Sequence, residues 1–489
     1  MINNEDIDFL KKYGITKKTL ETQVKNLSNN TNFQYIIEAV CIKKGIYAPE
    51  DIDSYINLYE QQKNNFSIER FVPASGAATR MFKQLINYHS SPNEKNNYTN
   101  EGFYSAKTSI ENIEKFAFYD NLKKLNIDTT DAKTVVDNIL YSGLKYVNSP
   151  KALIEFHKYK NTTRTAFEEH IIESLKLCNN QANTKIHFTI SEQAMNDFEK
   201  KLNEIRTKSK WNDLNISFSY QEKSTNTIAI YENGDLVRDE HKNLLLRPGG
   251  HGSLLQNLNK LKSDFVFIKN IDNVIHNDYL EETIKYQKLL GGILISLINK
   301  ISKIYNNLIQ EASGEDIDEA ISFLNSKFEA GFTRNTKIEE LIAYINRPIR
   351  VCGMVKNTGE PGGGPFWTKN TAGKKTLQIV EKAQIDFNDA EQKLLFNNST
   401  HFNPVNMVCY LKNPQNKRFD LNKFVDHNSF FVAKKTHSGQ NIKALEHPGL
   451  WNGAMANWIT LFVEIPLITF NPVKELNDLL RKEHQPIIT

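Results

Sequence analysis

A glycine-rich segment between apolar stretches restricts the fold more than any other part of the chain. It reads L-R-P-G-G-H-G-S-L-L-Q-N-L-N-K-L-K-S-D-F-V-F-I-K-N-I-D-N over residues 246–273. Gly249, Gly250 and Gly252 let the backbone approach a ligand where any side chain would collide. The leucines that follow recur at helical spacing and predict a short helix capped by Ser253. We interpret the segment as a ligand-binding loop that opens a helix.

An apolar strand, predicted for Phe265–Ile268, leads from this helix to Asp272. In open α/β sheets, ligands bind beyond the carboxyl ends of the strands. A carboxylate there, beside a glycine loop, is typical of a metal ion held against a phosphate. The alternative is a tight connection with an Asx turn. We would prefer that alternative for one glycine, but the whole segment favours a binding site.

The composition limits the class of protein. The 489 residues are 39% hydrophobic and 24% charged, and 61 basic against 57 acidic residues give a net charge of +4 without a basic block. Nucleic acid is therefore not an expected partner. The longest apolar run, residues 289–298, is about half a membrane span. The N-terminus lacks a basic and apolar signal segment, so we expect a cytoplasmic protein without a membrane partner.

The cysteines are isolated from one another and show no C-x-x-C spacing. This pattern argues against a zinc site or a disulfide framework. We expect four free thiols, at Cys41, Cys178, Cys352 and Cys409.

A second informative segment covers residues 66–85. A strand at Ser67–Val72 is followed by P-A-S-G-A-A-T-R-M-F-K and then by a helix. A strand, a loop of small residues and a helix N-terminus aim backbone N–H groups at an anion. Arg80 and Lys83 lie three residues apart, so both are predicted to bind the same phosphates. The alternative is a tight helix start with solvated basic residues, since the Walker pattern is absent.

Further strands are predicted at Lys185–Ile190 and Ile216–Tyr220, with helices between them. Alternating strands and helices predict an α/β fold with a mixed, mostly parallel central sheet flanked by helices. The loops after its strands, at Ser75, Ser191, Gln221, Gly250 and Asp272, should meet at the carboxyl edge of the sheet. We predict four parts: a helical N-terminal extension (1–63), an α/β half (64–278), a helical insertion (279–345) and a C-terminal half (346–489).

Other segments give weaker indications. Lys151 follows Pro150, whose ring restrains the local backbone, and a fixed lysine suits an anion. His157 and His170 lack ligand spacing and are interpreted as ordinary polar or half-buried histidines. Tyr88–Tyr104 are predicted to form an exposed loop and Leu244–Leu246 a strand. Gly359–Trp367 are interpreted as a close-approach loop in which Phe366 or Trp367 stacks on a ligand ring; the alternative is a wide β-turn with an aromatic plug. Trp451 and Asn452 should line a pocket or pack a domain seam, and Phe470–Lys474 should open a final helix.

The order of these motifs resembles the sugar nucleotidyltransferases with a GT-A-like fold, especially the UDP-N-acetylhexosamine and UDP-glucose pyrophosphorylases. The matching segments are Ser75–Arg80, Pro150–Lys151, Thr189–Ser191, Phe218–Gln221, Gly250–Gly252, Asp272–Asn273, Gly353–Val355, Val380–Glu381, Lys434–Lys435 and Phe470–Lys474. P-A-S-G-A-A-T-R-M-F-K, R-P-G-G-H-G, F-I-K-N-I-D-N and G-E-P-G-G-G-P-F-W look like a bacterial family, domain of unknown function 4301, whose name assigns no reaction. Ala78 departs from the nucleotidyltransferase loop, which has its last glycine there, and its methyl group is expected to crowd a triphosphate.

The resemblance implies an enzyme that forms an NDP-sugar and pyrophosphate from an NTP and a sugar 1-phosphate with Mg²⁺. Its implied partners are therefore small molecules, a nucleotide and a sugar phosphate. The resemblance makes residues 64–278 the nucleotide-binding half and residues 346–489 the sugar-binding half. Catalytic roles would fall to Arg80, Lys83, Lys151 and Lys474, and the metal ligands would be Asp272 and Glu464. The implied substrate-binding residues are Ser75, Gly76, Ala77, Thr79, Gln221, Gly250, His251, Gly252, Gly353, Glu381 and Asn403.

Two alternatives remain at this point. The first is a non-catalytic nucleotide-sugar or sugar-phosphate binder on the same fold, with Ala78 as its signature. The second is a GT-A glycosyltransferase that uses Asp272 to hold the metal of an NDP-sugar. Lys151 and Lys474 favour nucleotidyl transfer over the glycosyltransferase, because extra phosphate clamps are needed when a triphosphate and a sugar phosphate bind together.

Overall fold

A computed structural model describes residues 2–29, 32–90, 100–178, 184–208, 214–359, 362–370 and 373–487. The chain divides into two compact units, and each is assembled from three separate stretches. The first unit contains residues 1–67, 221–267 and 289–466, and the second contains residues 68–220, 268–288 and 467–489. Two elements belong to both: strand β10 (Phe265–Lys269) and helix α11 (Leu280–Ile309).

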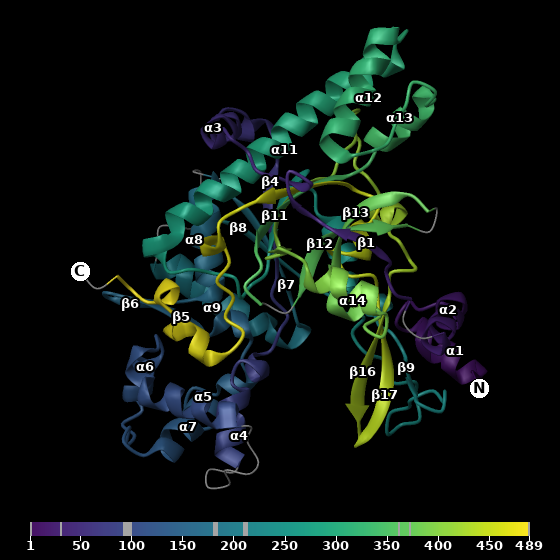
Figure 1. Ribbon diagram of the computed structural model, residues 1–489. Coiled ribbons are helices and arrows are strands. Elements are labelled where there is room, and N and C mark those ends of the chain that lie inside the picture. The colour runs from purple at the N-terminus through teal and green to yellow at the C-terminus, as the bar shows by residue number, and fades with distance from the viewer. Residues whose placement is uncertain are drawn as a thin grey trace. The chain divides into compact units, whose positions relative to one another are not determined.

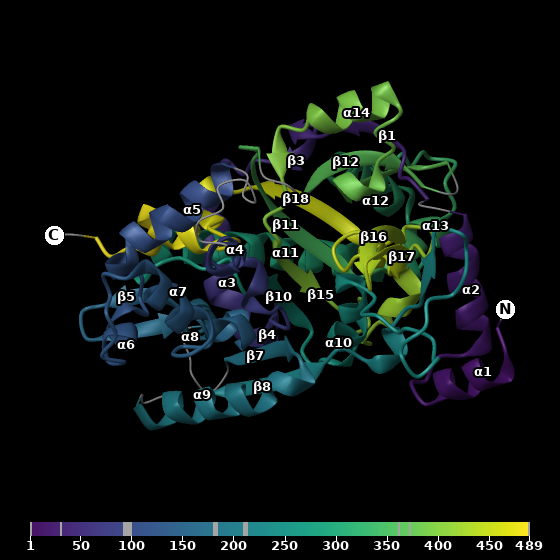
Figure 2. The same ribbon diagram turned by 90° about the horizontal axis from the view of Figure 1, so that it is seen from below.

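Three adjacent parallel strands organise the second unit (Figure 2). They are β4 (Ile68–Pro73), β7 (Lys185–Ile190) and β8 (Asn215–Tyr220). Helices α8 (Ala166–Cys178) and α9 (Met195–Lys208) pack on them through a cluster of aromatic rings. Its members are Phe167, Phe188, Phe198 and Phe218, with ring centroids 4.6–6.2 Å apart. The apolar side chains whose alternation predicted these strands therefore pack in the core beneath the helices.

Shorter elements complete the second unit. Strands β5 (Glu155–Tyr159) and β6 (Thr162–Thr165) form an antiparallel hairpin that leads into α8. The small helices are α4 (Lys83–Ser90), α5 (Asn100–Glu111), α6 (Tyr119–Lys123) and α7 (Ala132–Leu140). Their apolar faces, the strands and the C-terminal segment share one hydrophobic core, which includes Val473, Leu476 and Leu479.

A fully buried charged cluster lies inside the second unit. The Glu173 carboxylate on α8 accepts hydrogen bonds from Arg70 Nη1 (2.8 Å) and Lys269 Nζ (2.9 Å), and both cations are at most 2% exposed. The two cations hold the pKa of Glu173 below its ordinary value despite its burial. Gln287 donates to Glu173 and accepts from Arg70 (2.9 Å). Because a buried charge is stable only when paired, this cluster fixes α8 against the ends of β4 and β10.

In the first unit, β18 (Ile459–Glu464) lies between two parallel neighbours, β3 (Gly45–Tyr47) and β11 (Ile349–Lys356), and β11 runs beside it in Figure 2. Strand β2 (Cys41–Ile42) adds to β3 in parallel. Strands β15 (Asn406–Tyr410) and β14 (His401–Phe402) pair with β11 in antiparallel register. This part of the largest sheet is therefore mixed.

Two smaller antiparallel sheets belong to the first unit. One contains β1 (Ile36–Ala39), β12 (Gly363–Lys369) and β13 (Lys375–Glu381). The other contains β9 (Ala229–Tyr231) and the long hairpin of β16 (Phe431–His437) and β17 (Gln440–Glu446), which is visible in Figure 1. The helices of this unit are α1 (Asn4–Lys11), α2 (Lys17–Ser28), α3 (Ile52–Gln62), α10 (Leu255–Lys260), α12 (Gly314–Phe328), α13 (Ile338–Ile345) and α14 (Ala390–Asn397).

The predicted fold class is confirmed, because the largest sheet is mixed, mostly parallel and flanked by helices. The strands predicted around residues 68, 186, 217 and 266 are present, and the region after residue 279 is helical. Thr16 caps α2 by accepting from the Thr19 N–H (3.1 Å). The four cysteines are free thiols.

Four predictions of local structure were wrong. The N-terminal extension is not purely helical, because β1, β2 and β3 lie within it. Residues 363–369 form β12 rather than a loop, and the aromatic side chains expected to meet a ligand, Phe366 and Trp367, are buried in the core. Leu244 and Arg247 make only isolated bridges instead of a strand. The final helix is replaced by short 3₁₀ turns, Leu467–Thr469, Leu476–Leu480 and Lys482–His484.

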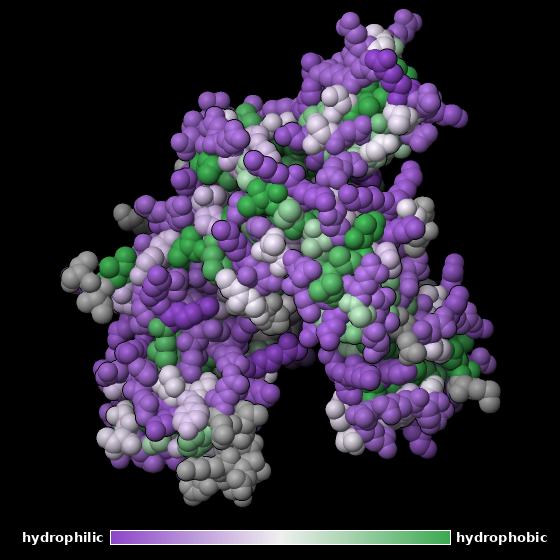
Figure 3. Space-filling view, in the orientation of Figure 1, coloured by the Kyte–Doolittle hydropathy of each residue, from purple (hydrophilic) through white to green (hydrophobic). Residues whose placement is uncertain are grey.

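The surface is mainly hydrophilic on the face shown in Figure 3, with apolar residues in small separate groups. Among the described helices, none is long and apolar enough to cross a membrane. The exposed loop predicted at Tyr88–Tyr104 falls largely on residues 91–99, outside the described residues. Its two ends are helical, in α4 and α5.

The buried charged cluster generates a stability prediction. Replacing Glu173 with Gln leaves two buried cations without a carboxylate, and we expect the free energy of unfolding to fall by about 3 kcal/mol or more. The matched control is Glu111→Gln, because Glu111 is 60% exposed in its side chain and pairs with Lys107 at 3.6 Å on the surface. That change should cost less than about 0.5 kcal/mol. Urea unfolding at pH 7 measures both, and equal midpoints would contradict the role assigned to the cluster.

A buried histidine generates a pH prediction. His187 on β7 is 7% exposed, stacks on Phe71 and lies 2.7 Å from the hydroxyl groups of Ser217 and Ser219. Burial lowers the pKa of His187 to about 4, so the folded protein keeps it neutral. The unfolded chain binds this proton below about pH 6.5, so the free energy of unfolding should fall between about pH 6.5 and 4, by up to about 1.4 kcal/mol per pH unit.

Denaturant unfolding at pH 7.0, 6.0 and 5.0 measures this contribution. Glutamine does not titrate. In His187→Gln, the number of protons taken up on unfolding below pH 6.5 should therefore fall by about one, and the free energy of unfolding should depend less on pH. The control His241→Gln changes a side chain that is 76% exposed and should leave the pH dependence as in the wild type. An identical pH dependence in all three proteins would show that His187 does not contribute.

Candidate functional site

The small-residue loop after β4 is held by backbone hydrogen bonds to two other segments of the second unit. The Ala74 N–H donates to the Thr189 carbonyl (2.8 Å) at the end of β7. The Lys151 N–H donates to the Gly76 carbonyl (3.1 Å), and the Ala78 N–H donates to the Ser149 carbonyl (3.3 Å). The loop is therefore rigidly placed beside Lys151, although the two segments are separated by more than 70 residues in sequence.

Most candidate residues of this loop are exposed, and Ala78 is not. The exposed candidates are Ser75, Gly76, Ala77, Thr79, Arg80 and Lys83. Ala78 is fully buried within the hydrophobic core of the unit. The expectation that its methyl group crowds a phosphate on the loop was therefore wrong, because the methyl group packs inward. Gly76 has an ordinary backbone conformation, and a Cβ added there would meet no atom within 4 Å.

The helix start differs from the prediction. A 3₁₀ turn covers Ala78–Arg80, and α4 begins at Lys83. The Ala78 N–H already donates to a carbonyl, so it is not a free donor for an anion. The exposed side chains of Arg80 and Lys83 supply positive charge at this loop.

The predicted carboxylate and the predicted lysine meet directly. Lys151 Nζ lies 2.8 Å from Asp272 Oδ2, and the side chains are 14% and 25% exposed. Asp272 follows β10 as predicted, and its carbonyl accepts from the Val473 N–H (3.0 Å). Lys474, the next residue, is half-buried, and its N–H donates to Asp478 Oδ2 (2.7 Å). The structure thus brings Lys151, Asp272 and the backbone beside Lys474 together from three distant segments.

A buried histidine supports the loop that carries Asp272. His170 Nε2 lies 3.2 Å from the carbonyls of Asn270 and Ile271, so this nitrogen is the protonated donor. Burial lowers the pKa of His170 to about 3, and the ring stays neutral. His157 is also fully buried. The interpretation of both as ordinary half-buried histidines was therefore wrong. Within α8 only the helical spacing of His170 with the apolar residues could have indicated its burial.

In the first unit, packing within the chain accounts for the glycines of R-P-G-G-H-G. A Cβ on Gly252 would lie 2.1 Å from the Pro448 carbonyl oxygen, and one on Gly249 would lie 2.4 Å from the His447 ring. Gly250 has a φ of +76°, which favours glycine. At Gly249 and Gly252, the missing side chain thus makes room for the loop around residue 448 and not for a ligand. Ser253 lies inside a 3₁₀ turn and does not cap α10, so that prediction was wrong.

The same two loops form a cluster of polar and aromatic side chains. The His251 ring stacks on Trp451 with centroids 4.1 Å apart, and His251 Nδ1 accepts from the Leu450 N–H (3.0 Å). Burial lowers the pKa of His251 to about 4, so its Nε2 carries the proton and faces Glu381 Oε1 at 3.6 Å. Trp451 Nε1 donates to the same oxygen (3.1 Å), while burial raises the pKa of Glu381. Trp451 therefore lies beside two candidate site residues, His251 and Glu381.

The remaining candidates of the first unit are occupied by local contacts. Gln221 Nε2 donates to Thr225 Oγ1 (3.2 Å). Gly353 is buried, and a Cβ there would lie 2.3 Å from the Ile465 side chain, which accounts for the glycine. Asn403 is buried and accepts from the Val405 N–H (3.1 Å). Glu464, at the end of β18, lies 3.7 Å from His401 Nε2.

The donor set suits a metal ion that arrives with phosphate. Within the described residues, no group of three or more His, Cys, Asp or Glu side chains is arranged to hold a metal ion. Magnesium usually keeps several waters and is bound through one or two carboxylates together with substrate phosphates. Asp272 offers one such carboxylate beside Lys151, so its surroundings fit a magnesium–phosphate complex better than a metal held by protein alone.

Comparisons with known proteins place the chain. The family model described as "Domain of unknown function (DUF4301)" matches residues 3–485. Similar solved structures include the uridine diphosphate N-acetylglucosamine pyrophosphorylase of Trypanosoma brucei (13% identity, TM-score 0.48, 97% of this chain and 74% of that one). The UDP-glucose pyrophosphorylase of Leishmania major is similar at 12% identity and a TM-score of 0.46, over 97% of this chain and 77% of that one. No curated protein matches.

The contrast between two glycines generates a prediction. Gly252→Ala should lower the free energy of unfolding by about 1–3 kcal/mol or more, because the methyl group would collide with the Pro448 carbonyl. Gly76→Ala is the matched control. It meets open space and should raise stability by about 0.4–1 kcal/mol by restricting the unfolded chain. Urea midpoints measure both, and a neutral Gly252→Ala would contradict the packing account of that loop.

Proposed function

We propose that this chain, which belongs to the DUF4301 family, is a sugar nucleotidyltransferase that forms an NDP-sugar and pyrophosphate from an NTP and a sugar 1-phosphate. One observation carries the proposal. Lys151 and Asp272 form a 2.8 Å ion pair beside the small-residue loop of residues 74–80, which backbone hydrogen bonds attach to residues 149–151. A loop of small residues, a fixed cation and a carboxylate are the groups that phosphoryl chemistry requires.

The reaction needs positioning more than covalent help. A phosphate oxygen of the sugar 1-phosphate attacks the α-phosphorus of the NTP in line and forms the new P–O bond. The bond from the α-phosphorus to its bridging oxygen breaks, and pyrophosphate leaves with that electron pair. No proton has to move, because the nucleophile is already an anion. Neutralisation of the developing charge is therefore the main task of the protein.

The basic residues of the second unit fit that task. Arg80 and Lys83 are exposed at the loop and would bind the leaving pyrophosphate, Arg80 through paired N–H groups. Lys151 pairs with Asp272, and Lys474 follows Val473, whose N–H donates to the Asp272 carbonyl. Both lysines would bind the other phosphates. Ser75, Gly76, Ala77 and Thr79 are exposed on the same loop. The open space at Gly76 is where a phosphate would approach the backbone.

Asp272 would hold Mg²⁺, as the resemblance implies. The resemblance also assigns metal binding to Glu464 of the first unit. When bound, the ion would supply neutralisation of the phosphate charge. The resemblance further assigns base recognition to Gln221, Gly250, His251 and Gly252, and sugar recognition to Gly353, Glu381 and Asn403. These assignments are part of the proposal. The stacked His251 and the half-buried Glu381 offer a planar ring and an acceptor for such contacts.

Ligand-induced stabilisation tests the proposal. The melting temperature of the purified protein is measured with each common NTP and NDP-sugar, with and without Mg²⁺. A ligand that binds the folded state must raise it by mass action. We expect Asp272→Asn to lose the part of this rise in melting temperature that depends on Mg²⁺, because its affinity for the nucleotide with Mg²⁺ should fall at least tenfold. Asp318→Asn is the control, because Asp318 pairs with the exposed Arg334 at 2.6 Å outside the site. It should respond like the wild type.

Gly76→Leu separates binding from folding. A Cβ at this position enters open space, so we expect a melting temperature without ligand that is no lower than that of the wild type, and at least a tenfold loss of nucleotide affinity. Pyrophosphate release with candidate sugar 1-phosphates then measures transfer. Stabilisation by nucleotides without pyrophosphate release would favour the non-catalytic binder. No stabilisation by any nucleotide or NDP-sugar would contradict the proposal.

A further inference from the structure

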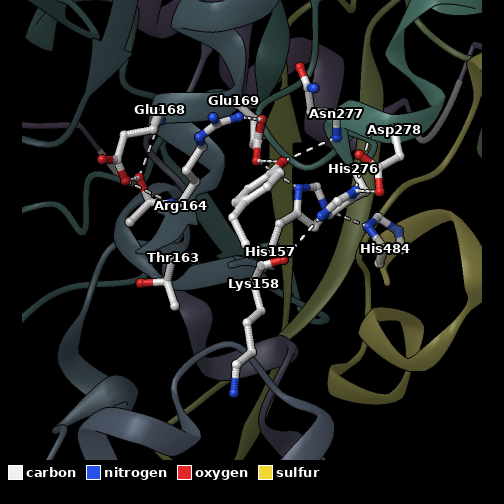
Figure 4. Close-up of polar contacts among 12 residues, drawn as sticks. His157, Lys158, Thr163, Arg164, Glu168, Glu169, His276, Asn277, Asp278 and His484 are labelled. Carbon is white, nitrogen blue, oxygen red and sulfur yellow. Dashed lines mark hydrogen bonds and ion pairs between the residues drawn. The ribbon is translucent and has the colours of Figure 1, made fainter. Parts of the chain in front are cut away.

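A cluster of buried polar side chains in the second unit has no role in the proposed chemistry (Figure 4). His157 lies on β5, Glu169 on α8, His276 in the loop after β10 and His484 in the last 3₁₀ turn. Each is at most 2% exposed. Burying this many polar groups is unfavourable unless they satisfy one another, so their presence demands an account.

The hydrogen bonds of the cluster converge on one carboxylate oxygen. Glu169 Oε1 accepts from the Tyr159 hydroxyl group (2.6 Å) and lies 2.9 Å from His157 Nδ1. Since a carboxylate only accepts, His157 Nδ1 carries a proton. The other nitrogen, His157 Nε2, lies 2.8 Å from His484 Nδ1. A single proton in that N–N contact completes a chain from His484 through His157 to Glu169.

Stacked rings extend the cluster to the loop of Asp272. The guanidinium of Arg164 lies 4.0 Å from the centroid of the Tyr159 ring. The His276 ring also stacks on Tyr159, with centroids 4.3 Å apart and an interplanar angle of 18°. The Tyr159 hydroxyl oxygen also accepts from the Asn277 N–H (3.1 Å). His276 Nε2 donates to the Lys158 carbonyl (3.0 Å). The cluster therefore joins β5 to the loop of residues 270–278 through side chains and backbone.

The C-terminal segment is attached at both ends to the same loop. The Val473 N–H donates to the Asp272 carbonyl (3.0 Å), and the His276 N–H donates to the Glu483 carbonyl (2.8 Å). The contact between His484 and His157 then fixes the end of this segment to β5. With the ion pair of Lys151 and Asp272, these contacts close a ring through three segments.

Each segment of this ring carries one charged residue of the proposed phosphate site. Lys151 lies six residues before His157, Asp272 lies four residues before His276, and Lys474 lies ten residues before His484. Networks of buried hydrogen bonds hold one geometry more strictly than apolar packing does. The second oxygen of the central carboxylate, Glu169 Oε2, faces Arg164 Nη1 at 3.7 Å. The ring thus restrains the relative positions of the three segments that carry these residues.

We propose that His157 and Glu169, together with Tyr159, are positioning residues that hold Lys151, Asp272 and Lys474 in the arrangement that binds phosphate. This inference rests on the proposed function. The residues act through the segments that they join and do not touch the substrate.

The test compares His157→Phe with His187→Phe. Both changes replace a buried imidazole in the second unit by a ring without hydrogen bonds, and each removes two side-chain contacts. His187 lies on β7 and has no contact with the ring of segments. Inorganic pyrophosphate is the probe, and its dissociation constant is measured by calorimetry well below both melting temperatures. We expect His157→Phe to weaken pyrophosphate binding at least tenfold and His187→Phe to change it less than twofold.

Amide hydrogen exchange supplies a second measurement. In His157→Phe, peptides covering residues 270–278 and 471–485 should exchange at least tenfold faster, and in His187→Phe they should not. Tyr159→Phe, which keeps the stacked rings and removes only the hydroxyl group, is the milder variant if His157→Phe does not fold. It should show the same changes to a smaller degree.

The outcomes separate the two proposals. Equal affinities for pyrophosphate in wild type, His157→Phe and His187→Phe would overturn the positioning role and leave the proposed function intact. Faster exchange without weaker binding would also overturn it, because the network would then be purely structural. No pyrophosphate binding by the wild type would contradict the phosphate site itself, and with it both proposals.

Discussion

The carboxylate of Glu173, buried between two cations, is the interaction on which the second unit depends. Arg70 lies on β4 three residues before its end, and Lys269 is the last residue of β10. Both bond to one carboxylate on α8. Since neither cation is stable there without it, the ends of the two strands must stay where the helix puts them. The small-residue loop and the loop of Asp272 begin directly after those strand ends.

Helix α8 organises these loops with three residues of one short stretch. Glu173 fixes the strand ends, His170 donates to the carbonyls of Asn270 and Ile271, and Glu169 accepts from the hairpin of β5. Glu169 and Glu173 are four residues apart and so lie on one face of the helix. A helix that buries two carboxylates and a neutral imidazole on that side gives up apolar packing and gains a defined geometry. The candidate site lies where those constraints meet.

The two glycine-rich loops show why sequence patterns gave an incomplete account. Apolar runs predicted β4, β7, β8 and β10, and with them the position of Asp272 after a strand, because strand periodicity is local. The collision that a Cβ on Gly252 would have with Pro448 involves residues almost 200 positions apart, which no local pattern reveals. The three successive glycines at residues 362–364 likewise indicated a loop. Gly363 and Gly364 instead belong to a β-strand, because they pair with β13. Gly76 is the reverse case, a glycine whose open surroundings leave room for a ligand.

The contact between Lys151 and Asp272 could not be predicted from residue spacing either, because the two residues are far apart in the sequence. Only the resemblance placed both residues in one site. The pair is partly exposed, so its attraction is moderate and its partners can exchange. A phosphate that attracts the ammonium group of Lys151 would leave Oδ2 of Asp272 free for a cation, and a cation at Asp272 would in turn free Lys151 for a phosphate. By linkage, each event favours the other to the same extent. The segments that carry the two residues cannot separate while the buried network holds them, so this exchange needs side-chain movement alone. A rigid backbone with one exchangeable ion pair is therefore suited to bind a metal ion and a phosphate together.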